Sequence, residues 1–233
     1  MFIYEQYISI ILIEVGARRR EDGMKSKKLI VYEILKQRIV NHDIKPGEPI
    51  NDGIIARELE VSKTPIREAV QQLEKEGFIE NIPGRGAFVS RISIQDVRET
   101  FEIREILECA AVKRAALRCD PQKLEALRRA FDSGETAFLD DDSRHFRSGD
   151  QIHAFIFESI GNQRLMEIYR RLLDHIVRLR IHFFSDAHQG RSEESYREHV
   201  EILNALAVRD PARCELAVRA HLRNSWEYVK SII

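Results

Sequence analysis

The sequence predicts a mostly α-helical protein, with an N-terminal winged helix-turn-helix and a C-terminal all-α bundle of about six helices. Two segments with helical spacing of apolar residues, 29–40 and 54–59, precede a third that opens on Thr64-Pro65. Two short β-like runs with a glycine-rich turn between them follow this third segment. From Ser93 onward no strand pattern occurs, so the rest of the chain is expected to be helical.

Composition limits the classes of protein that fit. The chain has 233 residues, of which 43% are hydrophobic, which is enough for a small module and a larger one with its own core. The formal net charge is −1, so binding to a polyanion requires a local basic patch. The cysteines lack CxxC spacing, which indicates a reducing compartment, the cytoplasm, and no disulfide framework: Cys109, Cys119 and Cys214.

Residues 1–23 contain an apolar run that Glu5 and Glu14 interrupt. The run is too short to span a bilayer, basic residues follow it, and no small-residue cleavage site stands out. We therefore predict neither a signal peptide nor a membrane partner. Met24 opens a segment typical of a cytosolic start, so residues 1–23 are interpreted as an upstream extension or a start-site artefact. An amphipathic arm that packs on a partner is the alternative.

The expected DNA-binding domain covers residues 24–90. Its first helix is predicted over 29–40, and Pro46-Gly47 forms a turn after it. Asn51 or Asp52 provides an N-cap for the short second helix, 54–59.

The third helix is predicted to begin with Thr64 as its cap and Pro65 at its first position, where the missing N–H costs nothing. Gly77 is a typical residue to follow its end. One face is apolar and consists of Ile66, Ala69, Val70 and Leu73. The runs Phe78-Ile79 and Ala87-Phe88-Val89, joined by the turn PGRG, complete a winged helix-turn-helix.

The helical domain is expected over residues 94–230, after the short junction SRIS. Ser93 and Asp96 resemble a capping box and predict a long helix through about Arg118. The pairs Asp120-Pro121 and Asp210-Pro211 each match an N-cap followed by the first helical residue. Gly161 is expected to end another helix. We also expect Ser192 to cap one.

The start of the third helix is the predicted contact with DNA. In a helix-turn-helix the second helix of the motif enters the major groove, and its N-terminal residues face the base edges. Arg67 and Gln71 lie opposite the apolar face, and arginine suits the paired acceptors of guanine. Ser62, Lys63 and Thr64 surround the helix N-terminus, where hydroxyl, ammonium and N–H groups hold phosphates.

The hairpin tip adds a second predicted contact. Arg85 lies between Gly84 and Gly86, and these small neighbours let the backbone approach a minor groove. Residues 24–90 contain 11 Lys and Arg against 10 Asp and Glu, a difference of only +1, so the positive residues must gather on one face. For Arg67, a solvated helix charge is the alternative interpretation.

The segment IKPGEPINDGIIARELEVSKTPIREAVQQLEKEGFIENIPGRGAFV resembles the DNA-binding domain of the GntR family of bacterial transcription regulators. The resemblance covers nearly all of residues 28–90, and its specific portions are VSxTPIREAVxxLExEG and GRGAFV. It implies a homodimer on a palindromic operator in double-stranded DNA, with base contact from Arg67. Gly53 departs from the pattern, because the family often has a polar residue there.

Three of the eight histidines differ from the isolated others: His153, His199 and His221. They lie on three separate predicted helices, each among apolar neighbours. Asp150 precedes His153 by three residues and can share its helix face. One carboxylate and three imidazoles suit a divalent transition metal, zinc or a similar ion, with open coordination positions. Buried histidines that hydrogen-bond one helix to another are the alternative.

Residues 94–225 are similar to the FCD effector domain of the FadR branch of this family, through FEIREILECAAVKRAA, IHAFIFESIGN, EHVEILNAL and DPARCELAVRAHL. The resemblance implies a metal held by one Asp and three His, which helps to bind a small organic acid. His153, His199 and His221 match the histidine positions. The family's Asp stands four residues before the first His, where this chain has Gly149, and Asp150 comes one residue later. Six helices would place the domain in the VanR-like subgroup.

Two further residues are candidates for effector binding. The guanidinium of Arg104 can pair with a carboxylate, and Asn162, directly after Gly161, can add a hydrogen bond. An ion pair with Glu105 or Glu108 is the alternative for Arg104.

Together these patterns predict a dimeric transcription regulator that responds to a small organic acid. Two rival hypotheses remain at the level of sequence. The helical half could serve only for dimerisation. A metal-dependent hydrolase is disfavoured, because no neighbouring Glu or Ser is evidently placed as a general base or nucleophile.

Overall fold

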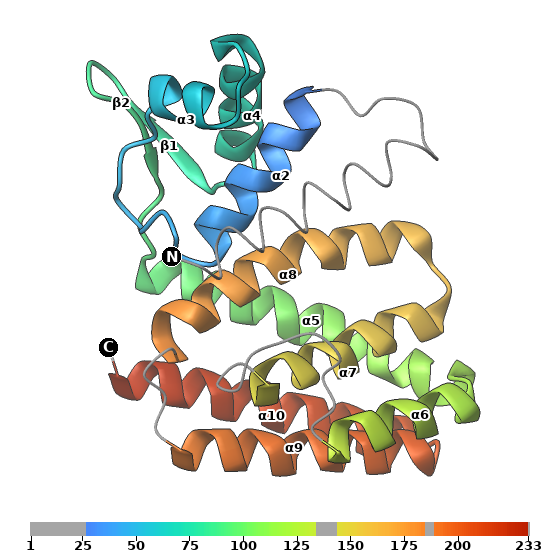
Figure 1. Ribbon diagram of the computed structural model, residues 1–233. Helices are drawn as coiled ribbons and strands as arrows, with labels where there is room; N and C mark the ends of the chain where they lie inside the picture. The colour runs from blue at the N-terminus through green and yellow to red at the C-terminus, as the bar shows by residue number, and fades with distance from the viewer. Residues whose placement is uncertain (1–26, 134–143, 185–188, 233) are drawn as a thin grey trace. The chain divides into compact units, whose positions relative to one another are not determined.

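The computed structural model describes residues 27–133, 144–184 and 189–232, and the chain divides into two compact units between Arg91 and Ile92 (Figure 1). The expectation for residues 1–23 lies outside the described residues. Each unit is treated by itself below.

The N-terminal unit has the predicted order of elements: α2 (Lys27–Val40), α3 (Asp52–Glu58), α4 (Lys63–Lys75), β1 (Ile79–Ile82) and β2 (Gly86–Val89). Helix α4 packs on both α2 and α3, and β1 contacts α4. The shared core is made of fully buried apolar side chains, including Leu35, Ile39, Ile66, Leu73 and Phe78.

Helix α4 begins earlier than its sequence predicts. Lys63 is the first helical residue and Ser62 is the N-cap, with an extended backbone, whereas Thr64 and Pro65 are the second and third helical residues. Proline is tolerated there because the first four N–H groups of a helix have no intrahelical partner. The N-cap of α3 is Asn51, whose Oδ1 accepts hydrogen bonds from the N–H groups of Gly53 and Ile54 at 3.0 and 3.1 Å.

The two strands form an antiparallel hairpin in which Ile79 pairs with Val89 and Ile82 with Gly86. The N–H of Arg85 donates to the carbonyl of Ile82 at 2.9 Å and closes the turn. Gly84 and Gly86 have φ values of 74° and 94°, a region that L side chains rarely adopt. The glycines on both sides of Arg85 are therefore required by the turn itself.

The described part of the C-terminal unit is all helical, with six helices: α5 (Ile94–Arg118), α6 (Pro121–Asp132), α7 (Arg144–Ile160), α8 (Gln163–Phe184), α9 (Gln189–Ala207) and α10 (Pro211–Ile232). In Figure 1, α5 and α10 run beside each other, and they form the most extensive helix contact of the unit. The fold class expected from the sequence is confirmed.

Most of the predicted helix ends in this unit are confirmed. Ser93 and Asp96 form a capping box, and the Asp120 carboxylate caps α6 ahead of Pro121. Gly161, with φ 70°, follows the end of α7. Ser192 is an exception, because α9 already begins at Gln189 and Ser192 lies inside its first turn.

The helical unit contains two separate apolar clusters. The larger joins all six helices of the described part of the unit, and within it Phe157 of α7 stacks on Tyr169 of α8 with 3.9 Å between the ring centroids. The smaller is built on Val97, Leu179 and Val229. Because the clusters are separate, the space between them is available for a cavity with polar side chains.

All three cysteines are free and buried. Burial raises the pKa of the Cys109 and Cys214 thiols to about 11, so both are protonated at neutral pH and poor nucleophiles. Among the described residues, no helix is both long and apolar enough to cross a membrane.

Candidate nucleic-acid interface and metal centre

Helix α4 exposes the side chains predicted to contact DNA. Pro65, Ile66, Ala69 and Leu73 are buried, which fixes the rotation of the helix. The residues assigned to bases and phosphates then lie on the exposed face and end of the helix: Ser62, Lys63, Thr64, Arg67 and Gln71. Ser62 makes no side-chain cap bond, so its hydroxyl is not committed to the helix it precedes.

Arg67 is held across the helix-turn-helix by an acidic residue of α3. Its Nε lies 3.4 Å from Oδ2 of Asp52, and its side chain is 68% exposed. An exposed pair of this kind is weak, but it limits the directions in which a long side chain can point. The contact with Asp52 is made by Nε, so the terminal nitrogens of Arg67 are not part of it.

Arg85 is exposed at the tip of the hairpin, with its guanidinium 5.5 Å from the Phe88 ring centroid. A side chain added to Gly84 or Gly86 would meet no atom within 4 Å. The surroundings of the tip are therefore open on both sides of Arg85.

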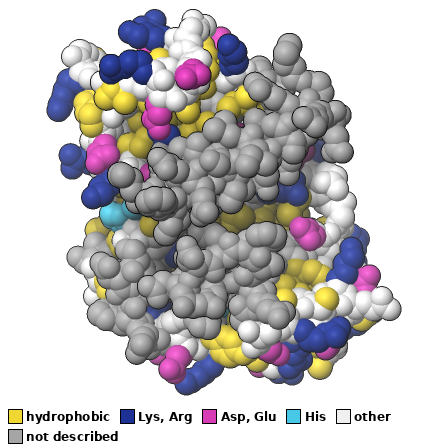
Figure 2. All heavy atoms as spheres, in the orientation of Figure 1, with side chains coloured by type: hydrophobic (Ala, Val, Ile, Leu, Met, Phe, Trp, Pro, Cys, Tyr) yellow, Lys and Arg dark blue, Asp and Glu magenta, His cyan; other side chains and the backbone are white. Residues whose placement is uncertain are grey.

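On the face shown in Figure 2, the basic residues of this unit do not form one continuous block. Figure 2 shows dark blue Lys and Arg side chains along the margin of the N-terminal unit, with acidic side chains between them. This agrees with the near balance of charge over residues 24–90.

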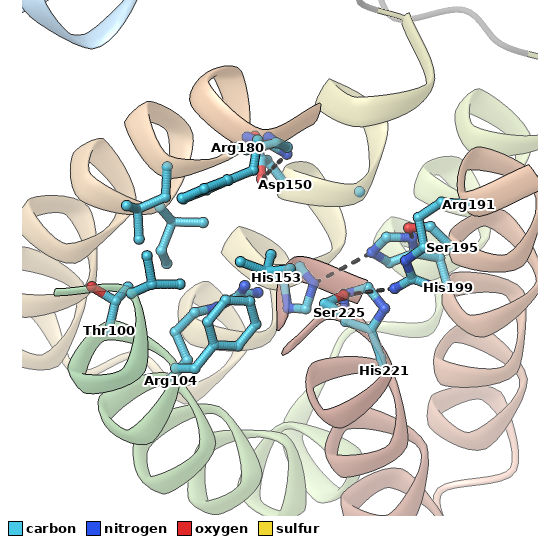
Figure 3. A pocket seen from close by; sticks show the side chains of 17 residues that line it. Thr100, Arg104, Asp150, His153, Arg180, Arg191, Ser195, His199, His221 and Ser225 are labelled. Atoms are coloured by element: carbon cyan, nitrogen blue, oxygen red, sulfur yellow. Dashed lines mark hydrogen bonds and ion pairs between the residues drawn. The ribbon is translucent and has the colours of Figure 1, made fainter. Parts of the chain in front are cut away.

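The structure brings His153, His199 and His221 together from helices α7, α9 and α10. One ring nitrogen of each lies within 4.8 Å of the corresponding atoms of the other two, and the two Nε2 atoms of His153 and His199 are 3.4 Å apart. All three side chains are buried. Figure 3 shows the three rings turned toward one another on one side of the cavity.

Each imidazole has a polar partner at its other nitrogen. Nδ1 of His153 lies 2.6 Å from Glu108, and Nδ1 of His221 lies 2.8 Å from Glu198. Nδ1 of His199 lies 3.4 Å from the hydroxyl of Ser195. Partners of this kind fix the ring orientation and direct Nε2 toward a shared point, as around metal-binding histidines.

The protonation states also suit a metal. Burial lowers the pKa of His199 and of His221 well below the usual value, and the neighbouring imidazoles lower it further. Burial alone would raise the pKa of Glu108, but Arg104 and His153 outweigh it and hold that pKa below its usual range. The site therefore combines the neutral imidazoles of His199 and His221 with the ionised carboxylate of Glu108 behind His153, and three imidazole donors fit a divalent transition metal.

Asp150 does not belong to this cluster. Its carboxylate pairs with the guanidinium of Arg180, with a 2.8 Å bond between Oδ1 and one terminal nitrogen. Successive residues of a helix are rotated by about 100° about its axis, so Asp150 points in a different direction from Gly149. This rotation turns Asp150 away from the imidazoles and toward α8. The structure thus places the Asp150 carboxylate in an ion pair with Arg180, and the three-histidine group does not include it.

Gly149 is in direct contact with the cluster. A Cβ atom at this position would lie 2.6 Å from Cε1 and 2.8 Å from Nε2 of His199. The His199 ring therefore occupies the space where a longer side chain at position 149 would begin. An aspartate there would require the ring to move.

A cavity extends from the histidines toward the smaller apolar cluster and opens to solvent, with about 700 Å³ of empty space when the adjoining open solvent is included. Arg104 lines it, 7% exposed, and its Nε donates to Glu108 at 2.7 Å. The ion-pair alternative for Arg104 is thus present in the structure, on the edge of the guanidinium nearest the main chain. Its position in the cavity wall keeps Arg104 a candidate for effector binding.

Asn162 has a different position from the one expected. Its Oδ1 accepts a hydrogen bond from the N–H of Leu165 at 3.1 Å, so it caps α8 on the exposed surface. It is not among the described residues that line the cavity. The structure does not bring Asn162 to the candidate effector site.

The sequence did not single out several side chains of the site, namely Arg180, Arg191, Ser195, Glu198 and Ser225. Arg191 is buried and donates to both carboxylate oxygens of Glu198, at 2.9 and 3.0 Å, and to Ser225 at 2.7 Å. Glu198 directly precedes His199 in the chain, and this adjacency was the feature of the sequence that could have identified Glu198 as part of the site. Its contact with His221 depends on the packing of α9 against α10 and could not be inferred from spacing.

Comparison with protein families gives matches to both units. Residues 27–89 match the family described as bacterial regulatory proteins, gntR family, and residues 99–224 match the FCD domain. The chain is 31% identical over 206 residues to the HTH-type transcriptional repressor RspR of Escherichia coli K12, with 87% of this chain and 88% of that protein covered. It is 25% identical over 235 residues to the repressor NanR of Salmonella arizonae, covering 93% and 89%.

Solved structures show the same fold. Escherichia coli McbR/YncC aligns with a TM-score of 0.71 at 20% identity, over 89% of this chain and 99% of that one. A transcriptional regulator from Rhodococcus sp. RHA1 gives the same TM-score at 23% identity, over 90% and 100%.

Proposed function

This chain belongs to the gntR family of bacterial regulatory proteins and carries an FCD domain, so it is a transcription regulator and not an enzyme. From that premise we propose that it binds a palindromic operator as a homodimer. We also propose that it responds to a small organic acid, which the helical unit holds with the help of a metal. It would act on chromosomal DNA in the cytoplasm.

The DNA-binding part of the proposal is supported by the exposed end of α4. The buried face of the helix leaves Arg67 and Gln71 outward, where they would contact base edges in the major groove. Ser62, Lys63 and Thr64 would hold phosphates at the helix N-terminus. The hairpin tip Gly84-Arg85-Gly86 would reach the adjacent minor groove.

The metal part of the proposal is supported by the histidine cluster, the single observation that contributes most. His153, His199 and His221 would hold a divalent transition metal, while Glu108, Glu198 and Ser195 orient their rings. Such a metal supplies positive charge and open positions for an anionic group. Arg104 would pair with the same anionic group from the side of α5.

The homodimer is supported by an exposed apolar stripe on α5. Ile103, Ile106 and Leu117 are 46%, 71% and 64% exposed, and they recur at helical spacing with the small, exposed Ala110 between them. A large exposed apolar face of this kind marks an interaction surface.

Charge along α5 favours a second copy of the same helix as the partner. The exposed residues beside the stripe are acidic in the N-terminal half, Glu99 and Glu102, and basic in the C-terminal half, Lys113 and Arg114. Two copies related by a two-fold axis near Ala110 would run antiparallel and place opposite charges together.

Regulation follows if the acid binds two arrangements of the dimer with different affinity. Only that difference can change the spacing or mobility of the two DNA-binding units, because a ligand with equal affinity for both arrangements shifts neither. A helical unit that serves only for dimerisation remains the alternative, and it predicts no effect of any acid on DNA binding.

Nuclease protection on DNA fragments from the neighbourhood of its own gene tests the proposal. We expect the purified protein, at low salt, to protect a site with two symmetric halves about one or two helical turns apart. Absence of protection on every fragment, with and without zinc and carboxylic acids, would contradict it.

A further inference from the structure

The cavity of the helical unit has two chemically different ends. Figure 3 shows His199 and His221 on one side of His153 and Thr100 and Arg180 on the other, with side chains made only of carbon filling the region between Thr100 and Arg180. One end is therefore suited to an anionic group, and the other to hydrocarbon.

The apolar end is built from the smaller hydrophobic cluster. Six side chains from α5, α8 and α10 form its wall, namely Val97, Phe101, Ile176, Leu179, Phe183 and Val229. Phe101 and Phe183 are only partly buried although they pack against this cluster. Their rings thus present hydrocarbon surface that an apolar ligand can cover.

Each guanidinium in the described wall of the cavity already faces a carboxylate. Arg104 pairs with Glu108, Arg180 with Asp150 and Arg191 with Glu198. Three cations against three anions leave no net positive charge in these pairs. Only the histidine end, with a bound metal, then offers an excess of positive charge for a ligand carboxylate.

We propose that the effector is a monocarboxylic acid with an unbranched or aromatic apolar body of several carbons, whose carboxylate faces the histidines and whose hydrocarbon lies among Phe101, Ile176 and Leu179. The inference deepens the proposed function and rests on its premise that an organic acid is sensed. A second carboxylate or several hydroxyls would lose hydration against these apolar side chains, and the guanidinium of Arg180 at this end is already paired with Asp150. The site thereby discriminates against dicarboxylic acids and sugar acids.

The chain contains its own reporter for this test. Trp226 is the only tryptophan, and its ring centroid is 5.7 Å from that of Phe101 in the cavity wall. Fluorescence of Trp226 in the full chain, loaded with zinc and without DNA, follows the titration of acetate, butyrate, hexanoate, octanoate and suberate. Suberate has the length of octanoate with a carboxylate at each end.

We expect affinity to rise with chain length, by about two- to fourfold for each methylene until the cavity is full. Octanoate should bind at least tenfold more tightly than either acetate or suberate. Equal affinities for acetate and octanoate, or for suberate and octanoate, would overturn the proposal.

A matched pair of substitutions locates the hydrocarbon. Ile176→Phe fills the apolar end and should lower octanoate affinity at least tenfold while acetate affinity changes less than twofold. Ile168→Phe makes the same change on the exposed face of α8, where Ile168 is 55% exposed, and should alter neither. Equal loss of octanoate binding in both variants would contradict the placement of the hydrocarbon beside Ile176. If Ile176→Phe does not fold, the titration of the wild-type protein with the five acids tests the proposal by itself.

The proposal and the proposed function can fail separately. If dicarboxylic or sugar acids bind and change operator affinity while octanoate does not bind, the acid class is wrong and the regulatory function stands. If no acid changes operator affinity although octanoate binds, the regulatory function fails.

Discussion

Arg67 combines high exposure with a fixed direction at the start of α4. The contact of its Nε with Asp52 orients the side chain, and the terminal nitrogens can form two bonds to one guanine. Such a pair would discriminate among bases, whereas phosphate contacts by the lysine and hydroxyls at the helix end would not depend on the base sequence.

Arg67→Ala should therefore lower operator affinity by about 1–3 kcal/mol and relax the choice of base at one position in each half-site. Binding to a set of operator variants by fluorescence anisotropy measures both effects. Lys75→Ala, which removes one positive charge at the other end of the same helix, is the matched control. An unchanged base preference in Arg67→Ala would remove Arg67 from its assigned role.

His199 links the cluster to Gly149 on one side and to Ser195 on the other. His199→Ala removes one of the three proposed nitrogen ligands, so metal content after dialysis should fall well below one ion per chain, while DNA binding by the metal-free protein stays nearly unchanged. Elemental analysis measures the loss, with His182→Ala as a control from outside the cluster. A full complement of metal in His199→Ala would show that this histidine has only a structural role.

Individual residues also show where sequence patterns stop being informative. The three histidines could be chosen because each stands among apolar neighbours on its own helix. Asp150 could not be excluded in the same way, because only the packing of α7 against α8 shows that Arg180 takes its carboxylate. Glu108 entered the sequence argument as a partner of Arg104, and its second contact, with His153, required the tertiary structure.

At the scale of elements, local signals were sufficient for most helices. Capping boxes and Asp-Pro pairs depend on neighbouring residues alone, which is why the starts of α5, α6 and α10 were predictable. The start of α4 was displaced by two residues, because several positions near a helix N-terminus accept proline. Segments 134–143 and 185–188 lie outside the described residues.

Helix α5 is the element on which dimerisation is predicted to depend. Ile106→Glu places a charge in the centre of its apolar stripe, and a two-fold interface receives the change twice. The dimer should dissociate at least tenfold more readily, a loss of about 1.4 kcal/mol or more. Light scattering across a concentration series measures it.

Ile168→Glu is the control for this experiment, because Ile168 is similarly exposed on α8, away from the stripe. A dimer that is equally stable in both variants would place the interface elsewhere on the molecule.

At the scale of the whole molecule, the proposed regulation couples two binding sites, one in each compact unit. In the proposed function the exposed end of α4 would bind DNA and the cavity beside the histidines would bind the acid. By linkage, each ligand would then change the affinity for the other by the same factor. A coupling of about 1–3 kcal/mol is typical of such regulators and corresponds to a 5- to 150-fold change.

The affinity of the zinc-loaded protein for its protected operator, measured with and without saturating octanoate, tests the central claim most directly. We expect the dissociation constant to change by at least fivefold, and the change to be lost in His199→Ala. An identical dissociation constant under both conditions, with the acid shown to be bound through Trp226 fluorescence, would contradict the account.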